Sequence, residues 1–191
     1  MKTIGVIGLG DMGSGIAKNL ILSGFEVMGL DLSPERMAAF EELGGRPATS
    51  VAEVGAASDA VFVMVMTGDQ AKDVILGDAG LVSSMSAGGA VILSATIQPH
   101  EARAIGASMD GSGLHMIDTP VSGGFPGAQG GTLTMMAAAP DAVLDEFAPV
   151  MEAVSANIHR VGDKPGDGQT VKACLQSLIG AQFSATFEAA A

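Results

Sequence analysis

The chain has 191 residues, a formal net charge of −12 at pH 7 and 48% hydrophobic residues. This composition excludes a disordered chain, and its length suits one domain with a short appendage. The acidic balance argues against a nucleic-acid partner, because phosphate binding needs clustered Lys and Arg, and no stretch approaches the length of a membrane span. A single cysteine, Cys174, excludes an internal disulfide and favours the reducing cytoplasm.

Short apolar runs alternate with helical patterns along most of the chain. Strands are predicted over residues 3–8, 25–30, 60–65, 89–93, 114–117, 132–138 and 157–161. Helices are predicted over residues 12–23, 99–109 and 140–153, and another opens at Ser33-Pro34 and ends at Gly44-Gly45. The segment from Asp118 to Gly131 is predicted to be a glycine-rich loop. The alternation predicts an α/β fold with a doubly wound, mostly parallel, Rossmann-like sheet.

Each end of the chain calls for its own interpretation. The opening MKTIGVIGLG is predicted to be a core strand and not a signal peptide, because its apolar run is short and broken by glycine. From about Gly168 to Ala191 a helical pattern runs without a terminating cap, so this helix is expected to continue. The predicted division is therefore an α/β domain over residues 1–163 and the start of a long helix over residues 164–191.

A glycine-rich motif follows the first predicted strand and opens the first predicted helix. Gly8, Gly10 and Gly13 form G-x-G-x-x-G, with Leu9, Asp11 and Met12 between them. The first glycine permits a tight turn, the second admits a pyrophosphate, and the third allows close packing of helix and strand. The amides at the helix N-terminus then bind the phosphates, which matters in a chain so poor in cations. The motif predicts a dinucleotide site over residues 8–13.

An acidic residue at the end of the second predicted strand completes the dinucleotide motif. Asp31 lies at the position from which a carboxylate hydrogen-bonds the adenosine ribose hydroxyls. A 2′-phosphate would face this carboxylate, and the next basic residue, Arg36, belongs to the following helix. The sequence therefore predicts that the cofactor is NAD rather than NADP.

Three motifs together resemble the β-hydroxyacid dehydrogenase family, which includes the 3-hydroxyisobutyrate and 6-phosphogluconate dehydrogenases. The stretch 7–20 (IGLGDMGSGIAKNL) resembles the family's N-terminal signature. DTPVSGG at 118–124, with glycines following to residue 131, resembles its substrate-binding loop. GDGQTVK at 166–172 resembles the segment that carries its catalytic lysine. Members often have Asn three or four residues after that lysine, and Gln176 there resembles the branch containing L-threonate dehydrogenase.

The resemblance implies a role for each matched residue. Lys172 would take the proton from the hydroxyl of a small hydroxy acid while hydride leaves for the nicotinamide. Ser122, Gly123 and Gly124 would bind the substrate carboxylate, and Gln176 would orient the lysine or bind a substrate hydroxyl. Val65, Met66 and Thr96 follow the ends of their strands and would lie against the cofactor. The family also continues into an all-helical second domain, which is expected to lie outside this chain.

Other interpretations of these residues stay open at the level of sequence. Lys172 could be a solvated surface lysine, Gln176 a helix-packing residue and Met66 a core residue. Asp118 is expected to fix its loop, Cys174 to be packed, and the scattered histidines to form no metal site. A module that binds NAD without turnover is a second function, and slow turnover by this chain is expected. Imine reduction is disfavoured because that branch generally replaces the lysine.

An apolar stripe on the last predicted helix bears on quaternary structure. Ile179, Phe183 and Phe187 recur every four residues and so share one face of the helix. Exposed apolar surface of this kind commonly associates with another chain, so a homo-oligomer is predicted.

Overall fold

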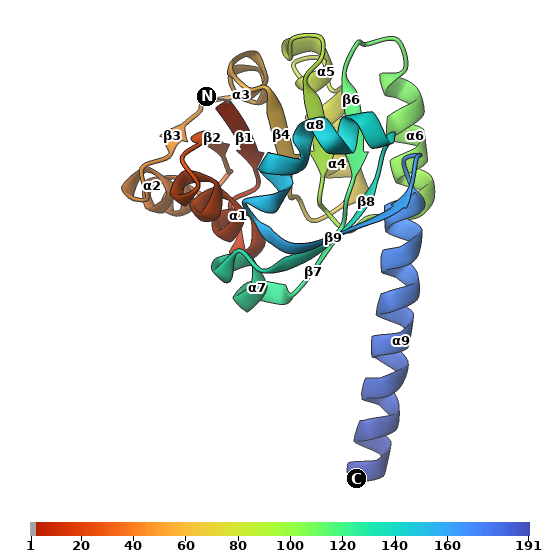
Figure 1. The fold of residues 1–191 in the computed structure, drawn as a ribbon. Coiled ribbons are helices and arrows are strands. Elements are labelled where there is room, and N and C mark those ends of the chain that lie inside the picture. The colour runs from red at the N-terminus through yellow and green to blue at the C-terminus, as the bar shows by residue number, and fades with distance from the viewer. Residues whose placement is uncertain (1–2) are drawn as a thin grey trace.

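A computed structural model describes residues 3–191 and shows a single twisted sheet covered by helices on both faces (Figure 1). The sheet has nine strands in the order β3-β2-β1-β4-β5-β6-β8-β7, and β9 pairs with β8. The strands are β1 (Thr3–Ile7), β2 (Glu26–Leu30), β3 (Arg46–Pro47), β4 (Ala60–Val63), β5 (Ala90–Leu93), β6 (His115–Asp118), β7 (Val121–Ser122), β8 (Leu133–Ala138) and β9 (Ser155–Gly162). Strands β1 to β6 pair in parallel, whereas β8 runs antiparallel to β6 and β7. The predicted mostly parallel, doubly wound sheet is confirmed.

The helices lie between the strands as the alternation requires. They are α1 (Asp11–Leu22), α2 (Pro34–Glu42), α3 (Val51–Ala57), α4 (Gly68–Leu76), α5 (Leu81–Ser84), α6 (Pro99–Met109), α7 (Gly124–Gly130), α8 (Asp141–Glu152) and α9 (Asp167–Ala190). The Ser33 hydroxyl accepts a hydrogen bond from the Arg36 amide, and Pro34 occupies the first turn, so the predicted start of α2 is correct.

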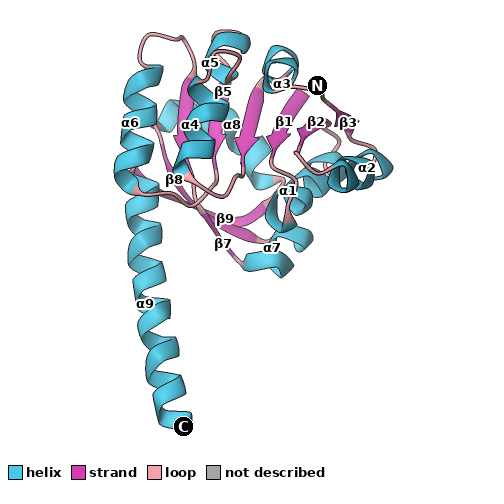
Figure 2. Cartoon of the chain, turned by 180° about the vertical axis from the view of Figure 1, so that it is seen from behind, coloured by secondary structure: helices cyan, strands magenta, loops and turns pink. Residues whose placement is uncertain are grey.

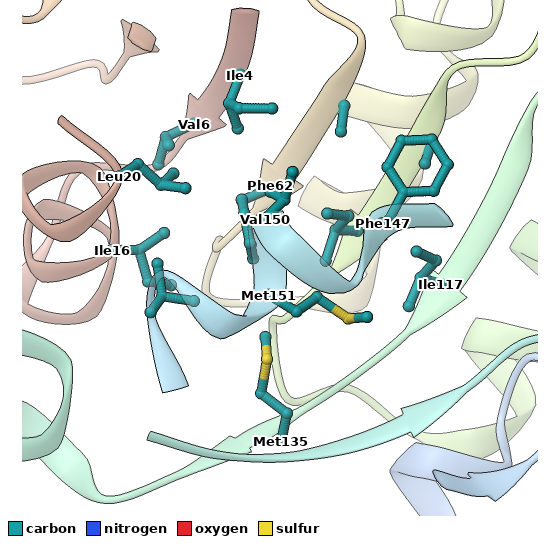
Figure 3. Close-up of a cluster of buried hydrophobic side chains, with 14 of the residues drawn as sticks. Ile4, Val6, Ile16, Leu20, Phe62, Ile117, Met135, Phe147, Val150 and Met151 are labelled. Carbon is teal, nitrogen blue, oxygen red and sulfur yellow. The ribbon is translucent and has the colours of Figure 1, made fainter. Parts of the chain in front are cut away.

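Two apolar layers hold the sheet between its helices (Figure 2). On one face α1, α2 and α8 pack through residues such as Ile16, Phe40 and Phe147. Figure 3 shows Ile16 and Phe147 in this cluster. On the other face α3 to α6 contribute residues such as Val54 and Ile75. Strand β4 is buried along its whole length because both of its faces are covered, which explains its uninterrupted apolar sequence.

The structure corrects the sequence interpretation in two regions. Residues 118–131 are not a continuous loop, since they contain β7 and α7. The glycines there concealed a helix that exists because it packs on α1: a Cβ at Gly15 would lie 2.5 Å from the Ala128 carbonyl carbon. The Asn19 side chain also donates to the Ala128 carbonyl oxygen at 2.8 Å. The sequence patterns did not predict β3, α3, α4 or α5, which lie on either side of the correctly predicted β4, because these short elements give no clear period.

The final helix differs from the others in its surroundings. Figure 1 shows α9 leaving the sheet and projecting away from it. Only its first turns are buried, through Gly168, Gln169 and Lys172. Leu178, Phe183 and Phe187 are 58%, 59% and 70% exposed. Within residues 3–191, none of the helices combines the length and the hydropathy that crossing a membrane requires.

Candidate active site

The glycine turn between β1 and α1 has the geometry that its motif predicts. Gly8 adopts φ +92°, and a Cβ there would lie 2.2 Å from the Met64 carbonyl oxygen. A Cβ at Gly13 would lie 1.7 Å from the Gly8 carbonyl oxygen. A Cβ at Gly10 would clash with no atom, because its nearest neighbours are atoms of the Arg36 guanidinium at van der Waals distance, 3.8 Å. Gly10 also gives α1 no side-chain cap, so the first amides of α1 stay available to a pyrophosphate.

Asp31 lies beside this turn and joins it to the second strand. Its Oδ2 accepts a 2.7 Å hydrogen bond from the Leu9 amide, and its Oδ1 accepts a 2.9 Å hydrogen bond from the Ser33 amide. The Arg36 Nη1 lies 3.4 Å from the same Oδ2, and the Asp31 side chain is 7% exposed. Arg36 belongs to the following helix as expected, but its side chain reaches back over the acid. The position predicted to bind the adenosine ribose therefore holds a carboxylate paired with a guanidinium.

A pocket of about 330 Å³ opens next to the glycine turn. It lies where the carboxyl ends of β4 and β5 meet the β7 segment and α9, which is where open α/β sheets bind ligands. Of the residues predicted to form the site, the pocket brings together Met12, Thr96, Ser122, Gly123, Gly124, Lys172 and Gln176.

Other predicted site residues lie outside the lining of this pocket. The adjoining glycine turn contains Gly8, Leu9, Gly10, Asp11 and Gly13, and Asp31 lies beside it. Val65 follows β4 and does not line the pocket. Met66 is 85% exposed, so the alternative that it packs in the core is wrong. Cys174 is exposed as well, so the expectation of a packed cysteine is also wrong.

Among residues 3–191, Lys172 is the only cationic side chain that lines this pocket, and it lies on the first turns of α9. It is 7% exposed. Burial lowers the pKa of its ammonium from the ordinary value of 10.5, because the charged form loses hydration. A buried lysine of this kind supplies a neutral amine more readily than a solvated lysine does. The alternative that Lys172 is a solvated surface lysine is therefore wrong.

The Ser122–Gly124 loop, which lines the same pocket as Lys172, has a hydroxyl and backbone amides. Ser122 ends β7, whose pairing with β8 fixes the position of the loop. Gly123 follows with φ +128° and Gly124 with φ +57°, conformations that L side chains rarely adopt. Successive amides in such a glycine turn form a concavity suited to a carboxylate.

Sequence reasoning missed three residues that line the pocket: Met64, Ser94 and Val121. Ser94 is 1% exposed, and its hydroxyl has no hydrogen-bond partner in the structure of residues 3–191. A buried hydroxyl without a partner at the wall of a pocket fits a site that receives a polar ligand. Met64 and Ser94 directly follow β4 and β5, so the rule on strand ends would have found both.

The open glycine turn, the acid after β2 and the pocket at the strand ends define this part of the molecule as a dinucleotide-binding domain. Residues 3–162 match the family model described as the NAD binding domain of 6-phosphogluconate dehydrogenase. The chain belongs to this family, which confirms the predicted family and NAD as cofactor. No group of three or more His, Cys, Asp or Glu side chains within the described part of the chain could hold a metal ion.

Curated relatives extend the match over the whole chain. The chain is 40% identical to an L-threonate dehydrogenase of Cupriavidus necator and 34% identical to a 3-hydroxyisobutyrate dehydrogenase of Pseudomonas aeruginosa. Each match covers 100% of this chain but 64% of the relative, so the chain spans just under two thirds of their length. A crystal structure of a 3-hydroxyisobutyrate dehydrogenase from Salmonella typhimurium superposes with a TM-score of 0.92 at 35% identity, covering 99% of this chain and 66% of that one.

Proposed function

We propose that this protein is an oxidoreductase that transfers a hydride from a small hydroxy acid to NAD, with Lys172 as the general acid/base. The observation that carries the proposal is the pocket beside the glycine turn, which buried Lys172 and the Ser122–Gly124 loop both line. The substrates named for its relatives, L-threonate and 3-hydroxyisobutyrate, are small hydroxy acids. We propose a substrate of the same class here.

The residues of the glycine turn and the pocket wall suit the binding of NAD. Gly8 to Gly13 would hold the pyrophosphate at the start of α1, and Asp31 would bind the ribose hydroxyls. Thr96 and Ser94 would lie toward the nicotinamide, with Val65 and Met66 against the cofactor at the end of β4. When bound, NAD supplies the acceptor for the hydride that leaves the carbinol carbon.

Lys172 supplies the proton chemistry in this proposal. Its neutral amine removes the proton from the substrate hydroxyl while the carbon–oxygen bond becomes a carbonyl, and the ammonium returns that proton in the reverse direction. The lowered pKa of Lys172 favours this role, because more of the amine is neutral near neutral pH. Gln176, one helical turn further on the same face of α9, would orient the amine or bind a substrate hydroxyl.

The loop from Ser122 to Gly124 would fix the substrate carboxylate on the other side of the pocket. The backbone amides and the Ser122 hydroxyl are donors, which suits an anion in a chain of net charge −12. This contact would hold the carbinol carbon between Lys172 and the nicotinamide position. Positioning of this kind supplies a large part of the rate enhancement of enzymes.

We further propose that the chain prefers NAD to NADP, since Asp31 faces the position of a 2′-phosphate. The domain division, with residues 1–163 as the cofactor-binding unit and 164–191 as the start of an interdomain helix, also belongs to this proposal. So does a cytoplasmic location, which rests on the single cysteine.

The test of the proposed function uses the protein at its natural length. NADH binding is followed by fluorescence, and NAD reduction is then measured with L-threonate and with 3-hydroxyisobutyrate. Turnover of either acid that depends on Lys172 supports the proposal. Tight NADH binding with no turnover of hydroxy acids would instead favour a module that binds the cofactor without catalysis.

Self-association is proposed for the exposed face of α9. Phe183 and Phe187 are exposed, and their rings stack with centroids 6.1 Å apart. A second copy could cover this face in a symmetric pair. Light scattering after size-exclusion chromatography should show an oligomer that Phe183→Ser with Phe187→Ser reduces to a monomer. A monomer at micromolar concentration in the unsubstituted protein would contradict this.

A further inference from the structure

A buried polar network lies directly beneath the pocket, at the point where α9 begins. Asp118 at the end of β6 is 0% exposed, and Gln169 on the first turn of α9 is 1% exposed. The Gln169 Nε2 donates to the Asp118 Oδ1 at 3.0 Å. The Asp118 Oδ2 accepts from the Gly166 amide at 2.7 Å and from the Gln169 amide at 3.2 Å. Asp118 therefore caps the N-terminus of α9 from a neighbouring strand.

The same glutamine also binds the segment that follows β5. Its Oε1 accepts from the Ile97 amide at 3.1 Å, and its Nε2 donates to the Ala95 carbonyl oxygen at 2.9 Å. These two residues flank Thr96, which lines the pocket. Only a side-chain amide fits here, because one end of Gln169 meets a donor and the other end meets acceptors.

The network joins three of the five segments that line the pocket. The segment after β5 carries Thr96, the segment after Asp118 carries Ser122 and Gly123, and α9 carries Lys172. Gln169 precedes Lys172 by three residues, so the two side chains share one face of the helix. The backbones of α9 and of the end of β6 also approach each other closely, since a Cβ at Gly168 would lie 2.7 Å from the Asp118 carbonyl oxygen.

We propose that Gln169 and Asp118 are positioning residues, which fix Lys172 at a set place between the Thr96 segment and the Ser122–Gly124 loop. Neither side chain lines the pocket, so each acts through the backbone and helix that it holds. A fully hydrogen-bonded buried network specifies one geometry, because any displacement leaves a buried polar group without a partner. The inference rests on the proposed role of Lys172.

The test measures the environment of Lys172 without relying on turnover. The protein is labelled with an amine reagent over a range of pH, and peptide mass spectrometry follows the extent of reaction at Lys172. Gln169→Met keeps the length of the side chain but removes its donor and acceptor, and Gln169→Asn keeps the amide but shortens its reach. The matched control is Val54→Ala, a buried residue of α3 that packs beside Gly5 of β1 and does not line the pocket.

We expect both Gln169 variants to move the midpoint of Lys172 labelling upward by about half a pH unit or more, because the released helix start hydrates the amine. Affinity for ADP-ribose, which probes the glycine turn and Asp31, should stay within about threefold, since the network does not reach that turn. Turnover of L-threonate in the natural-length protein should fall by about tenfold or more. Val54→Ala should lower stability and leave the labelling midpoint of Lys172 unchanged.

Two results would overturn the inference. One is an unchanged labelling midpoint in both Gln169 variants, and the other is an equal shift in Val54→Ala. If the Gln169 variants do not fold, hydrogen exchange in the unsubstituted protein tests the inference. The Ile97 amide, which donates to Gln169, should be strongly protected, and rapid exchange at this amide would refute the positioning role of Gln169. Failure of the proposed function is distinguishable, since it appears either as no turnover of hydroxy acids or as wild-type turnover in Lys172→Ala, and both leave the labelling result unaffected.

Discussion

The glycine turn and the pocket lie side by side but are assembled in different ways. The turn is local: Gly8 to Gly13 and Asp31 come from one β-α-β unit, and the backbone provides its shape. The pocket is lined by residues from five separate segments, of which Met12 and Gln176 are the first and last in sequence. The proposed cofactor binding in this fold therefore depends on backbone conformation, whereas the proposed chemistry depends on how distant segments are held together.

The largest expected effect breaks the pocket while sparing the turn. Lys172→Ala removes the proposed general acid/base and should lower turnover in the natural-length protein by about 100-fold or more. NADH affinity, measured by fluorescence, should stay within about threefold because the glycine turn is untouched. Turnover close to that of the unsubstituted protein would place the proton route elsewhere.

Substitutions in the glycine turn should weaken cofactor binding. Two glycines there distinguish the shape of the turn, which Gly8 supports, from the access of the cofactor phosphates, which Gly10 permits. Gly10→Ala should weaken NADH binding by about tenfold without loss of stability, because its Cβ meets nothing nearer than Arg36 at 3.8 Å but occupies the phosphate approach.

Gly8→Ala is the matched variant for Gly10→Ala. It should lower the free energy of unfolding by about 2 kcal/mol, since a Cβ at φ +92° clashes with the Met64 carbonyl oxygen. Thermal unfolding measured beside NADH titration separates the two cases. Equal loss of stability in both variants would show that Gly10 is also required for the shape of the turn.

The ion pair of Asp31 and Arg36 should set the preference between NADH and NADPH. NADH should bind about tenfold more tightly than NADPH, and Asp31→Ala should narrow this gap. Arg36→Ala should widen it by about threefold to tenfold, because the guanidinium at 3.4 Å from Asp31 offsets part of the repulsion of a 2′-phosphate. Titrations of both nucleotides check this, and equal affinities in the unsubstituted protein would refute the charge argument.

The smallest expected effect concerns stability and pH. The folded state lowers the pKa of Lys172 below its ordinary 10.5, so burying the ammonium costs stability wherever the unfolded chain holds that proton. Lys172→Met should therefore raise the free energy of unfolding by about 1 kcal/mol at pH 7. The advantage should shrink as the pH rises from the lowered pKa toward 10.5. Urea unfolding at several pH values measures the difference in the free energy of unfolding between Lys172→Met and the unsubstituted protein. A difference that grows as the pH rises would contradict this prediction.

Much of the fold was predictable because its signals are local. The strands around 3–7, 60–63 and 90–93 are apolar runs, and the start of α2 follows from Ser33 and Pro34. The short α7 escaped prediction because its glycines disfavour a helix in isolation. It forms because Gly15 lets α1 approach Ala128, a contact between residues far apart in sequence.

The sequence by itself determined the glycine turn, the acid after β2 and the presence of a lysine in a familiar motif, since each is a short-range pattern. Only the tertiary structure decided that Lys172 is buried, that Arg36 pairs with Asp31 and that the Ser94 hydroxyl lacks a hydrogen-bond partner among residues 3–191. It alone also brought Gln169 to Asp118 and the Thr96 segment. The physical reason is that burial and hydrogen bonding depend on what packs around a side chain, and those neighbours come from segments that no local pattern connects.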